Sequence, residues 1–198
     1  MTWNITGKHV LLTGGTSGIG RATAAQLARL GAHVTITSRR LATAEAVADE
    51  LSVATRNEVE PAELDLSSLD AVRTFATAYT DHHDRLDILV NNAGTMAGTR
   101  RTTVDGHEWT FAVNHLGPFR LTNLLIPLLI DSTPARVITV SSENHRGARH
   151  GLDFDDLQMT SGYSSSKAYA ASKLANILFT VELDRRLAPQ GVAARALH

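Results

Sequence analysis

Short apolar runs alternate along the chain with segments of helical periodicity. The apolar runs predict strands at residues 8–13, 32–37, 59–64, 86–90, 136–140 and 191–197. The periodic segments predict helices at residues 20–30, 42–51, 69–79, 104–129 and 166–187. Strands that alternate with helices are typical of parallel βαβ units. The pattern therefore predicts an α/β fold with a doubly wound parallel sheet.

Single residues add detail to the predicted strands and helices. Pro61 cannot donate a ladder hydrogen bond, so the third strand is expected at an edge of the sheet. Ser67 or Ser68 is suited to cap the helix that follows. Pro118 lies inside the longest predicted helix segment, where it predicts a kink. The polar stretch 142–165 is either a surface excursion beside the site or a solvated loop without a role.

Composition narrows the class of protein. The 198 residues suffice for one domain with a full core. The net charge of -1, without a stripe of Lys and Arg, argues against a nucleic-acid partner. The absence of cysteine excludes disulfides and thiolate chemistry and fits a reducing compartment. The nine histidines are scattered, so no metal site is expected.

The chain shows no membrane or export signal. No apolar run approaches the about 18 residues of a membrane span. The first residues lack a basic segment followed by an apolar one. We therefore expect a cytoplasmic protein.

A glycine-rich turn follows the first strand. Residues 13–20 read TGGTSGIG, and a predicted helix comes directly after them. Glycines let the backbone approach a pyrophosphate, and the helix N-terminus offers free N–H groups to the phosphates. A strand before and a helix after make this turn a specific sign of a nucleotide site. The predicted contacts are Gly14, Thr16, Ser17, Gly18, Ile19 and Gly20.

The end of the second strand bears on the choice of cofactor. Enzymes that use NAD usually place an acid at this position, whereas this chain has Ser38 followed by Arg39 and Arg40. Arg39 would pair with a 2′-phosphate through charge-assisted hydrogen bonds. We therefore expect NADP(H) to be preferred, with NAD(H) possible. The alternative is that both arginines are simply exposed charges.

Tyr169 and Lys173 have the spacing that puts two side chains on one helix face. A nearby ammonium lowers the pKa of a tyrosine, which is otherwise near ~10. Tyr169 can then exchange a proton with a carbonyl or alcohol oxygen, and Lys173 would bind the nicotinamide ribose. Tyr163 and Lys167 have the same spacing. The serines between them suit a helix start, so the later pair is favoured.

Two further polar positions are candidates. The fifth strand ends in Ser141 and Ser142, at the edge where parallel sheets bind ligands, and strand alternation points one of the two toward the site. Asn114 lies near the expected kink, where its side chain can hold a water or a freed carbonyl. By itself such an asparagine is more often a capping or surface residue.

Together these motifs resemble the short-chain dehydrogenase/reductase family. The matching pieces are TGGTSGIG at 13–20, DL at 65–66, NNAG at 91–94, FAVNHLGPF at 111–119, VSS at 140–142 and YAASK at 169–173. The resemblance implies a Rossmann fold with strand order 3-2-1-4-5-6. It places the family's catalytic residues at Asn114, Ser142, Tyr169 and Lys173, with substrate contacts from Ser142 and Tyr169. It also implies cofactor contacts from Asp65, Leu66, Asn92, Ala93, Gly94, Tyr169 and Lys173.

Within the family, the chain is most similar to the branch of retinol dehydrogenases and WW-domain oxidoreductases. The stretches LGPFRLTNLLIPLL, SSENHRGA and YAASKLANILFTVEL carry this similarity. It implies a lipophilic or aromatic alcohol or carbonyl as substrate. Family members usually continue past the sixth strand, so we expect a single NAD(P)-binding domain that ends before the substrate lid and last strand.

The motifs predict an NADP(H)-dependent oxidoreductase, and two other functions are weighed against it. Epimerases and dehydratases that act on nucleotide sugars share the Tyr and Lys pair, but their glycine turn usually has a different spacing. A catalytically silent NADP(H) sensor or scaffold would keep the fold without turnover.

The two long helices also resemble those that join family subunits, which implies a homodimer or homotetramer. Alternatively, their apolar faces only cover the sheet.

Overall fold

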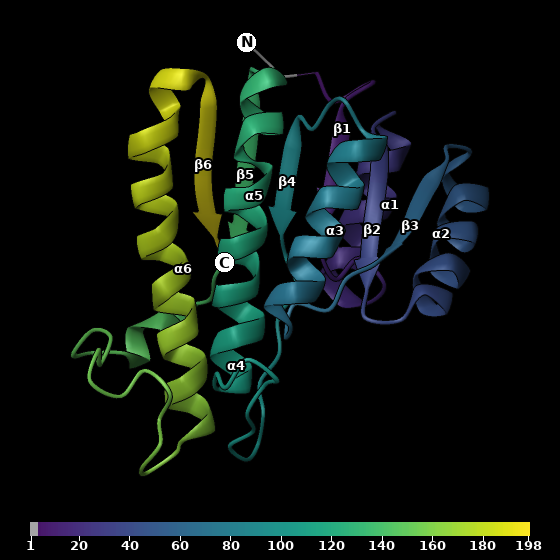
Figure 1. Ribbon diagram of the computed structural model, residues 1–198. Coiled ribbons are helices and arrows are strands. Elements are labelled where there is room, and N and C mark those ends of the chain that lie inside the picture. The colour runs from purple at the N-terminus through teal and green to yellow at the C-terminus, as the bar shows by residue number, and fades with distance from the viewer. Residues whose placement is uncertain (1–3) are drawn as a thin grey trace.

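A parallel sheet forms the centre of the molecule (Figure 1). The computed structural model describes residues 4–198. Within that range the sheet has the order β3-β2-β1-β4-β5-β6, and every neighbouring pair is parallel. The strands are β1 (His9–Leu12), β2 (His33–Ser38), β3 (Val59–Glu63), β4 (Ile88–Asn91), β5 (Ala135–Val140) and β6 (Val192–Leu197). The predicted fold class and strand order are confirmed.

Helices cover both faces of the sheet (Figure 1). The longer ones are α1 (Gly18–Arg29), α2 (Leu41–Thr55), α3 (Leu69–His82), α5 (Gly117–Asp131) and α6 (Ser165–Leu187). The short ones are α4 (Trp109–Phe111), the π-helical turn η1 (Ala112–Leu116), and the 3-10 turns η2 (Glu143–Gly147) and η3 (Ala188–Gln190). Each long α-helix follows a strand, as the alternating pattern predicts.

Two hydrophobic cores lie on opposite faces, because successive strand residues point to opposite sides. On one face, Leu11 of β1 and Leu89 of β4 belong to a cluster with buried residues of α3, α5 and α6, including Leu121 and Leu125 of α5. Val10, Leu12 and Val90 pack with α1 and α2 on the other face. The continuous apolar runs of β1 and β4 thus arise because both of their faces are buried.

Most boundaries differ from prediction by a few residues at element ends. β3 is the edge strand that Pro61 predicts. Ser68 is the residue that caps α3, since its Oγ accepts a hydrogen bond from the Ala71 amide at 3.2 Å. The helix predicted to end at residue 51 runs to Thr55, where Arg56 adopts a left-handed conformation without a glycine to signal it.

The continuous helix predicted at 104–129 is wrong at its N-terminal end. Helical structure begins at Trp109, because the Glu108 carboxylate accepts hydrogen bonds from the amides of Thr110 and Phe111 at 2.9 and 2.7 Å. A π-helical turn then occupies Ala112–Leu116, and α5 follows with Pro118 in its first turn. The expected irregularity near Pro118 is therefore a π turn just before it.

Candidate functional site

The glycine turn packs against the segment that follows β4. The Thr13 hydroxyl accepts the amides of Asn92 and Ala93, both at 3.1 Å, and the Asn92 Nδ2 donates to the carbonyls of Thr13 and Gly14. A Cβ on Gly20 would lie 2.2 Å from the Gly14 oxygen. Only glycine fits there, so the sequence brings the start of α1 close to the end of β4.

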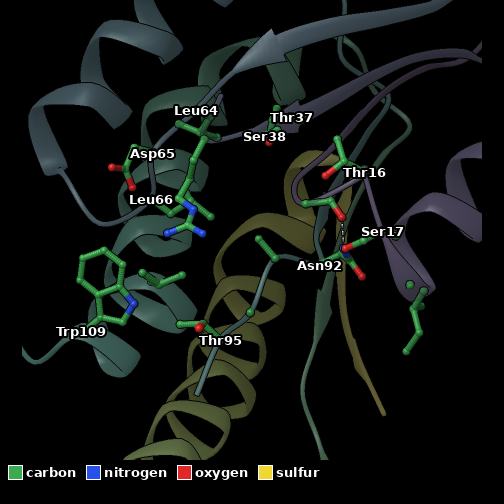
Figure 2. A pocket seen from close by; sticks show the side chains of 18 residues that line it. Thr16, Ser17, Thr37, Ser38, Leu64, Asp65, Leu66, Asn92, Thr95 and Trp109 are labelled. Carbon is green, nitrogen blue, oxygen red and sulfur yellow. Dashed lines mark hydrogen bonds between the residues drawn. The ribbon is translucent and has the colours of Figure 1, made fainter. Parts of the chain in front are cut away.

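These segments border a cavity of about 560 Å³ at the carboxyl ends of the strands (Figure 2). The predicted cofactor residues on its wall are Gly14, Thr16, Ser17, Gly18, Ile19, Gly20, Ser38, Arg39, Asp65, Leu66, Asn92, Ala93 and Gly94. Figure 2 shows Asp65, Leu66 and Trp109 toward one end and Thr16, Ser17 and Asn92 toward the other. Residues from the ends of β1 to β4 thus meet around one space.

The wall also holds residues that sequence reasoning missed. They are Thr37, Leu64, Thr95, Trp109 and Val113. Thr37 and Leu64 adjoin predicted contacts in the sequence, so proximity is the signal that could have found them. Trp109 precedes Val113 by four residues, and this spacing puts both on one side of the α4 and η1 segment. Nothing in the pattern distinguishes this tryptophan from a core residue.

Arg39 and Asp65, at the end of the cavity that is predicted to hold adenosine, differ in their exposure and contacts. Arg39 is exposed on the cavity wall. Asp65 is half-buried, and its Oδ1 accepts hydrogen bonds from the Ser67 amide at 2.9 Å and the Ser67 hydroxyl at 2.7 Å. The turn after β3 is therefore fixed by Asp65, whereas Arg39 is exposed.

Tyr169 and Lys173 share one face of α6, with the Lys173 Nζ 5.4 Å from the centroid of the Tyr169 ring. Lys173 is 3% exposed, and its Nζ donates to the Val140 carbonyl at 2.9 Å. Burial lowers the pKa of Lys173 to about 8. Tyr169 is half-buried, and its hydroxyl makes no hydrogen bond to residues 4–198. The Tyr169 hydroxyl therefore keeps its hydrogen-bonding capacity for a ligand.

Lys173 and Asn114 adjoin the cavity at Gly94. A Cβ on Gly94 would lie 3.5 Å from the Lys173 Nζ and 3.6 Å from the Asn114 Oδ1. Tyr169 and Lys173 do not line the cavity themselves. The structure thus brings the predicted chemical centre to the end of the cavity where Gly94 and Thr95 lie.

The competing pair, Tyr163 and Lys167, is arranged differently. Tyr163 precedes α6, and its hydroxyl donates to the Ala97 carbonyl at 3.0 Å and lies 3.4 Å from the Glu108 Oε1. Lys167 is exposed. The two residues therefore do not form a pair on one helix face, and Tyr163 ties the loop before α6 to the segment before α4.

The two serines after β5 have separate environments. The Ser141 hydroxyl is buried and donates to the Lys173 carbonyl at 2.9 Å. Ser142 is half-buried at the start of η2, where its Oγ accepts the Asn144 amide at 3.2 Å. The Ser141 proton is thus engaged within the protein, whereas the Ser142 proton remains available as a donor.

Asn114 lies within the π turn and is 1% exposed. Its Oδ1 accepts the Thr95 amide at 2.7 Å, and its Nδ2 donates to the Thr95 carbonyl at 2.9 Å and to the Ser172 hydroxyl at 3.0 Å. The Ser172 hydroxyl in turn donates to the Tyr169 carbonyl at 2.7 Å. Asn114 therefore connects the cavity wall at Thr95 to the helix that carries Tyr169.

Comparison with known proteins decides the family. Residues 8–198 match the model of the short chain dehydrogenases. The chain belongs to the short-chain dehydrogenase family. Human retinol dehydrogenase 13 is 46% identical over 196 residues, which are 98% of this chain and 59% of that protein. Human retinol dehydrogenase 14 is 45% identical and aligned over 61% of its length. This short-chain dehydrogenase thus spans about three fifths of the length of these curated relatives.

Solved structures agree with this family. A Mycobacterium paratuberculosis protein of uncharacterized function has a TM-score of 0.82 and 41% identity, over 99% of this chain and 71% of the other. A metagenomic short-chain oxidoreductase solved with NADP has a TM-score of 0.79 and 28% identity, over 98% of this chain and 82% of the other. The resemblance to the retinol dehydrogenase branch of the short-chain dehydrogenases is confirmed.

Residues 4–198 also bear on membrane and metal sites. Within this range no helix is both long and apolar enough to cross a bilayer. The same residues contain no cluster of His, Asp and Glu suited to hold a metal ion. The cytoplasmic location stays a prediction.

Proposed function

We propose that this chain carries the cofactor and proton-transfer machinery of an NADP(H)-dependent oxidoreductase that interconverts alcohols and carbonyls. The observation that carries the proposal is the junction at Gly94, where the cavity of the glycine turn adjoins buried Lys173. The cavity fits a dinucleotide because the glycine turn lines it, Gly18 faces open space, and α1 presents its N-terminus. A bound nicotinamide cofactor supplies or accepts the hydride.

The chain's own residues would then handle the proton. Tyr169 Oη donates a proton to the substrate oxygen in reduction and accepts one in oxidation. The Lys173 ammonium lies near the Tyr169 ring, where its charge favours the phenolate form. Ser142 donates a hydrogen bond to the same substrate oxygen and orients it. Asn114 acts through position, because its amide is bonded to Thr95 and Ser172.

NADPH consumption by the full-length protein tests this proposal. Its loss of absorbance is followed with a panel of ketones, aldehydes and quinones, with lipophilic and aromatic members. We expect turnover that Tyr169→Phe abolishes and that the matched variant Tyr163→Phe retains. Retained activity in Tyr169→Phe would refute the assignment. Tight NADPH binding without turnover of any substrate would instead favour the alternative function, a silent sensor or scaffold.

The preference for NADP(H) rests on Arg39. It stands on the cavity wall after β2, where Ser38 replaces the acid typical of NAD enzymes. Arg39→Asp is expected to weaken NADPH binding and leave NADH binding equal or tighter. Arg40→Asp is the matched control for the change of charge. Equal NADPH affinity in Arg39→Asp and the unmodified protein would show that Arg39 is only an exposed charge.

A homodimer or homotetramer is supported by exposed apolar side chains on the outer helices. Phe119 and Leu124 of α5 and Leu178 and Val181 of α6 are all more than one third exposed. The rings of Phe119 and Phe179 lie 5.0 Å apart and join the two helices into one apolar face. Light scattering of the full-length protein and of Val181→Asp measures the assembly. A monomeric mass for the unmodified protein would contradict it.

A further inference from the structure

Pro118 changes the hydrogen bonding of the residue four positions earlier. In an α-helix each N–H donates to the carbonyl four residues before it, and proline has no N–H. Pro118 therefore cannot donate to the carbonyl of Asn114. Both residues are buried, so a carbonyl left without a donor would be unfavourable. Asn114 is also the residue whose side chain makes hydrogen bonds with the backbone of Thr95.

Asn176 of α6 supplies a donor to this carbonyl. Its Nδ2 donates to the Asn114 oxygen at 3.0 Å, and the side chain is buried. Its Oδ1 lies 3.1 Å from the Nδ1 of His115. An amide oxygen only accepts, so His115 Nδ1 carries the proton. Burial lowers the pKa of His115 below its usual value, which keeps the ring neutral at pH 7. The two bonds fix the orientation of the Asn176 amide.

The α6 helix thereby holds Asn114 at two points. Ser172 accepts a hydrogen bond from its side-chain amide, and Asn176 donates to its backbone carbonyl. Ser172 and Asn176 are four residues apart and lie on the helix face that also carries Tyr169 and Lys173. Any shift of the π turn relative to this face would break one of the two bonds. The spacing between Asn114 and the Tyr169 and Lys173 pair is thus set by α6 itself.

We propose that Asn176, oriented by His115, is a positioning residue for the active site. It supplies the Asn114 carbonyl with a hydrogen-bond donor, which Pro118 cannot provide, and keeps the Asn114 side chain aligned with Thr95. Thr95 and Gly94 in turn form the end of the cavity beside Lys173. The role in turnover rests on the oxidoreductase function proposed above. The role in holding Thr95 stands without it and has its own measurement.

The test replaces the donor without changing the size of the side chain. Asn176→Asp puts a carboxylate oxygen against the Asn114 carbonyl. We expect kcat to fall by about 10-fold to 10²-fold, the effect of a small misplacement, while the Kd for NADPH changes by less than about twofold. Asn123→Asp is the matched control. Asn123 also donates to a backbone carbonyl, that of Phe119 at 2.7 Å, but it is exposed on α5.

Substitutions at His115 separate positioning from general stability. His115→Leu removes the proton that orients Asn176, whereas His115→Asn retains an N–H donor near the same place. We expect His115→Leu to lower kcat and His115→Asn to recover most of it at similar melting temperature. Equal kcat in both variants, or unchanged kcat in a folded Asn176→Asp, would overturn the role in turnover.

Hydrogen exchange tests the positioning independently of activity. The Thr95 amide donates to the Asn114 Oδ1, so its exchange rate reports on that alignment. Faster exchange at Thr95 in Asn176→Asp, but not in Asn123→Asp, supports the proposal even if the protein turns over no substrate. Unchanged exchange at Thr95 contradicts it. Absence of NADPH binding by the unmodified protein would refute the proposed function, and the exchange result would still decide the role of Asn176.

Discussion

Lys173 is a cation in a nearly closed environment. It is 3% exposed, and the Val140 carbonyl is its hydrogen-bond acceptor. Burial lowers its pKa from 10.5 to about 8, so the ammonium persists at pH 7 but is less stable than in the unfolded chain. A depression of this size corresponds to a loss of stability of about 3 kcal/mol at pH 7. The burial of this lysine thus opposes folding, and its proposed role in proton transfer is what would explain its position.

Lys173→Met is therefore expected to stabilise the fold. Removing the buried charge gains about 3 kcal/mol, and losing the hydrogen bond to Val140 offsets about 1 kcal/mol of this. Because the folded-state pKa lies below the unfolded one, the folded lysine holds fewer protons between about pH 8 and about pH 10. The stability of the unmodified protein rises across that window, and the advantage of the variant shrinks. Urea unfolding at pH 7 and pH 10 measures both, and a less stable Lys173→Met at pH 7 would contradict this account.

Residue patterns identify candidate reactive positions but not their surroundings. The spacing of Tyr169 and Lys173, together with the serines that precede them, predicts that this pair lies on one helix face, but it leaves Ser141 and Ser142 undecided. The hydrogen bond from Ser141 to the Lys173 carbonyl separates the two serines, and it depends on how β5 meets α6. Trp109 reaches the cavity wall only through packing. Contacts between segments far apart in the sequence leave no local signal.

At the scale of elements, the π turn is the main departure from the predicted helices. Pro118 signals an irregularity, but periodicity does not distinguish a kink from a π turn. The start of α4 at Trp109 depends on the buried Glu108 carboxylate. A buried acid contradicts the usual preference of glutamate for the surface, so the pattern extends the helix too far. Both errors fall beside the site, where tertiary contacts override local preference.

Gly117 controls how closely α5 approaches the turn after β3. A Cβ at this position would lie 2.4 Å from the Leu66 carbonyl oxygen. Gly117→Ala is expected to destabilise the fold by about 1–3 kcal/mol and to weaken NADPH binding, because Leu66 lines the cavity. Thermal unfolding and NADPH titration measure the two effects. Gly98→Ala is the control, since its Cβ meets nothing within 4 Å, and equal behaviour of the two variants would refute this explanation.

At the scale of the whole molecule, the sequence predicts the architecture almost completely. Alternating strands and helices define the parallel sheet, and Pro61 identifies its edge. A parallel sheet collects the carboxyl ends of its strands on one side, so motifs far apart in the chain become neighbours. The shape of the cavity was not predictable, because it depends on side chains from the end of β2, the turn after β3, and the α4 and η1 segment.

The amino ends of the central strands, opposite the cavity, hold a buried carboxylate. Asp87 accepts hydrogen bonds from the Lys8 Nζ at 2.7 Å, from Arg85 at 2.7 and 2.8 Å, and from the His9 amide at 2.9 Å. Burial opposes the charge, but these bonds together hold the pKa of Asp87 well below its usual range. Asp87 thereby joins the start of β1 to the start of β4.

Asp87→Asn is expected to lower the free energy of unfolding by about 2 kcal/mol at pH 7. Because the folded-state pKa is depressed, this stabilisation is present above about pH 4 and is lost as pH falls through the lower, folded-state value. Urea unfolding at pH 7 and at about pH 5 should show the same difference between variant and unmodified protein. NADPH affinity should not change, since Asp87 lies at the amino ends of the strands and the cavity lies at their carboxyl ends. A changed affinity would mean that the two ends of the sheet are coupled.

The buried ammonium of α6 bears on how this sequence would respond to directed evolution. A library sorted only for heat resistance is expected to discard Lys173 early, because apolar replacements relieve an unfavourable burial. A library sorted for turnover is expected to retain it and to accumulate compensating changes elsewhere. Divergence of the two libraries at this single codon would measure how strongly selection for chemistry acts against selection for folding.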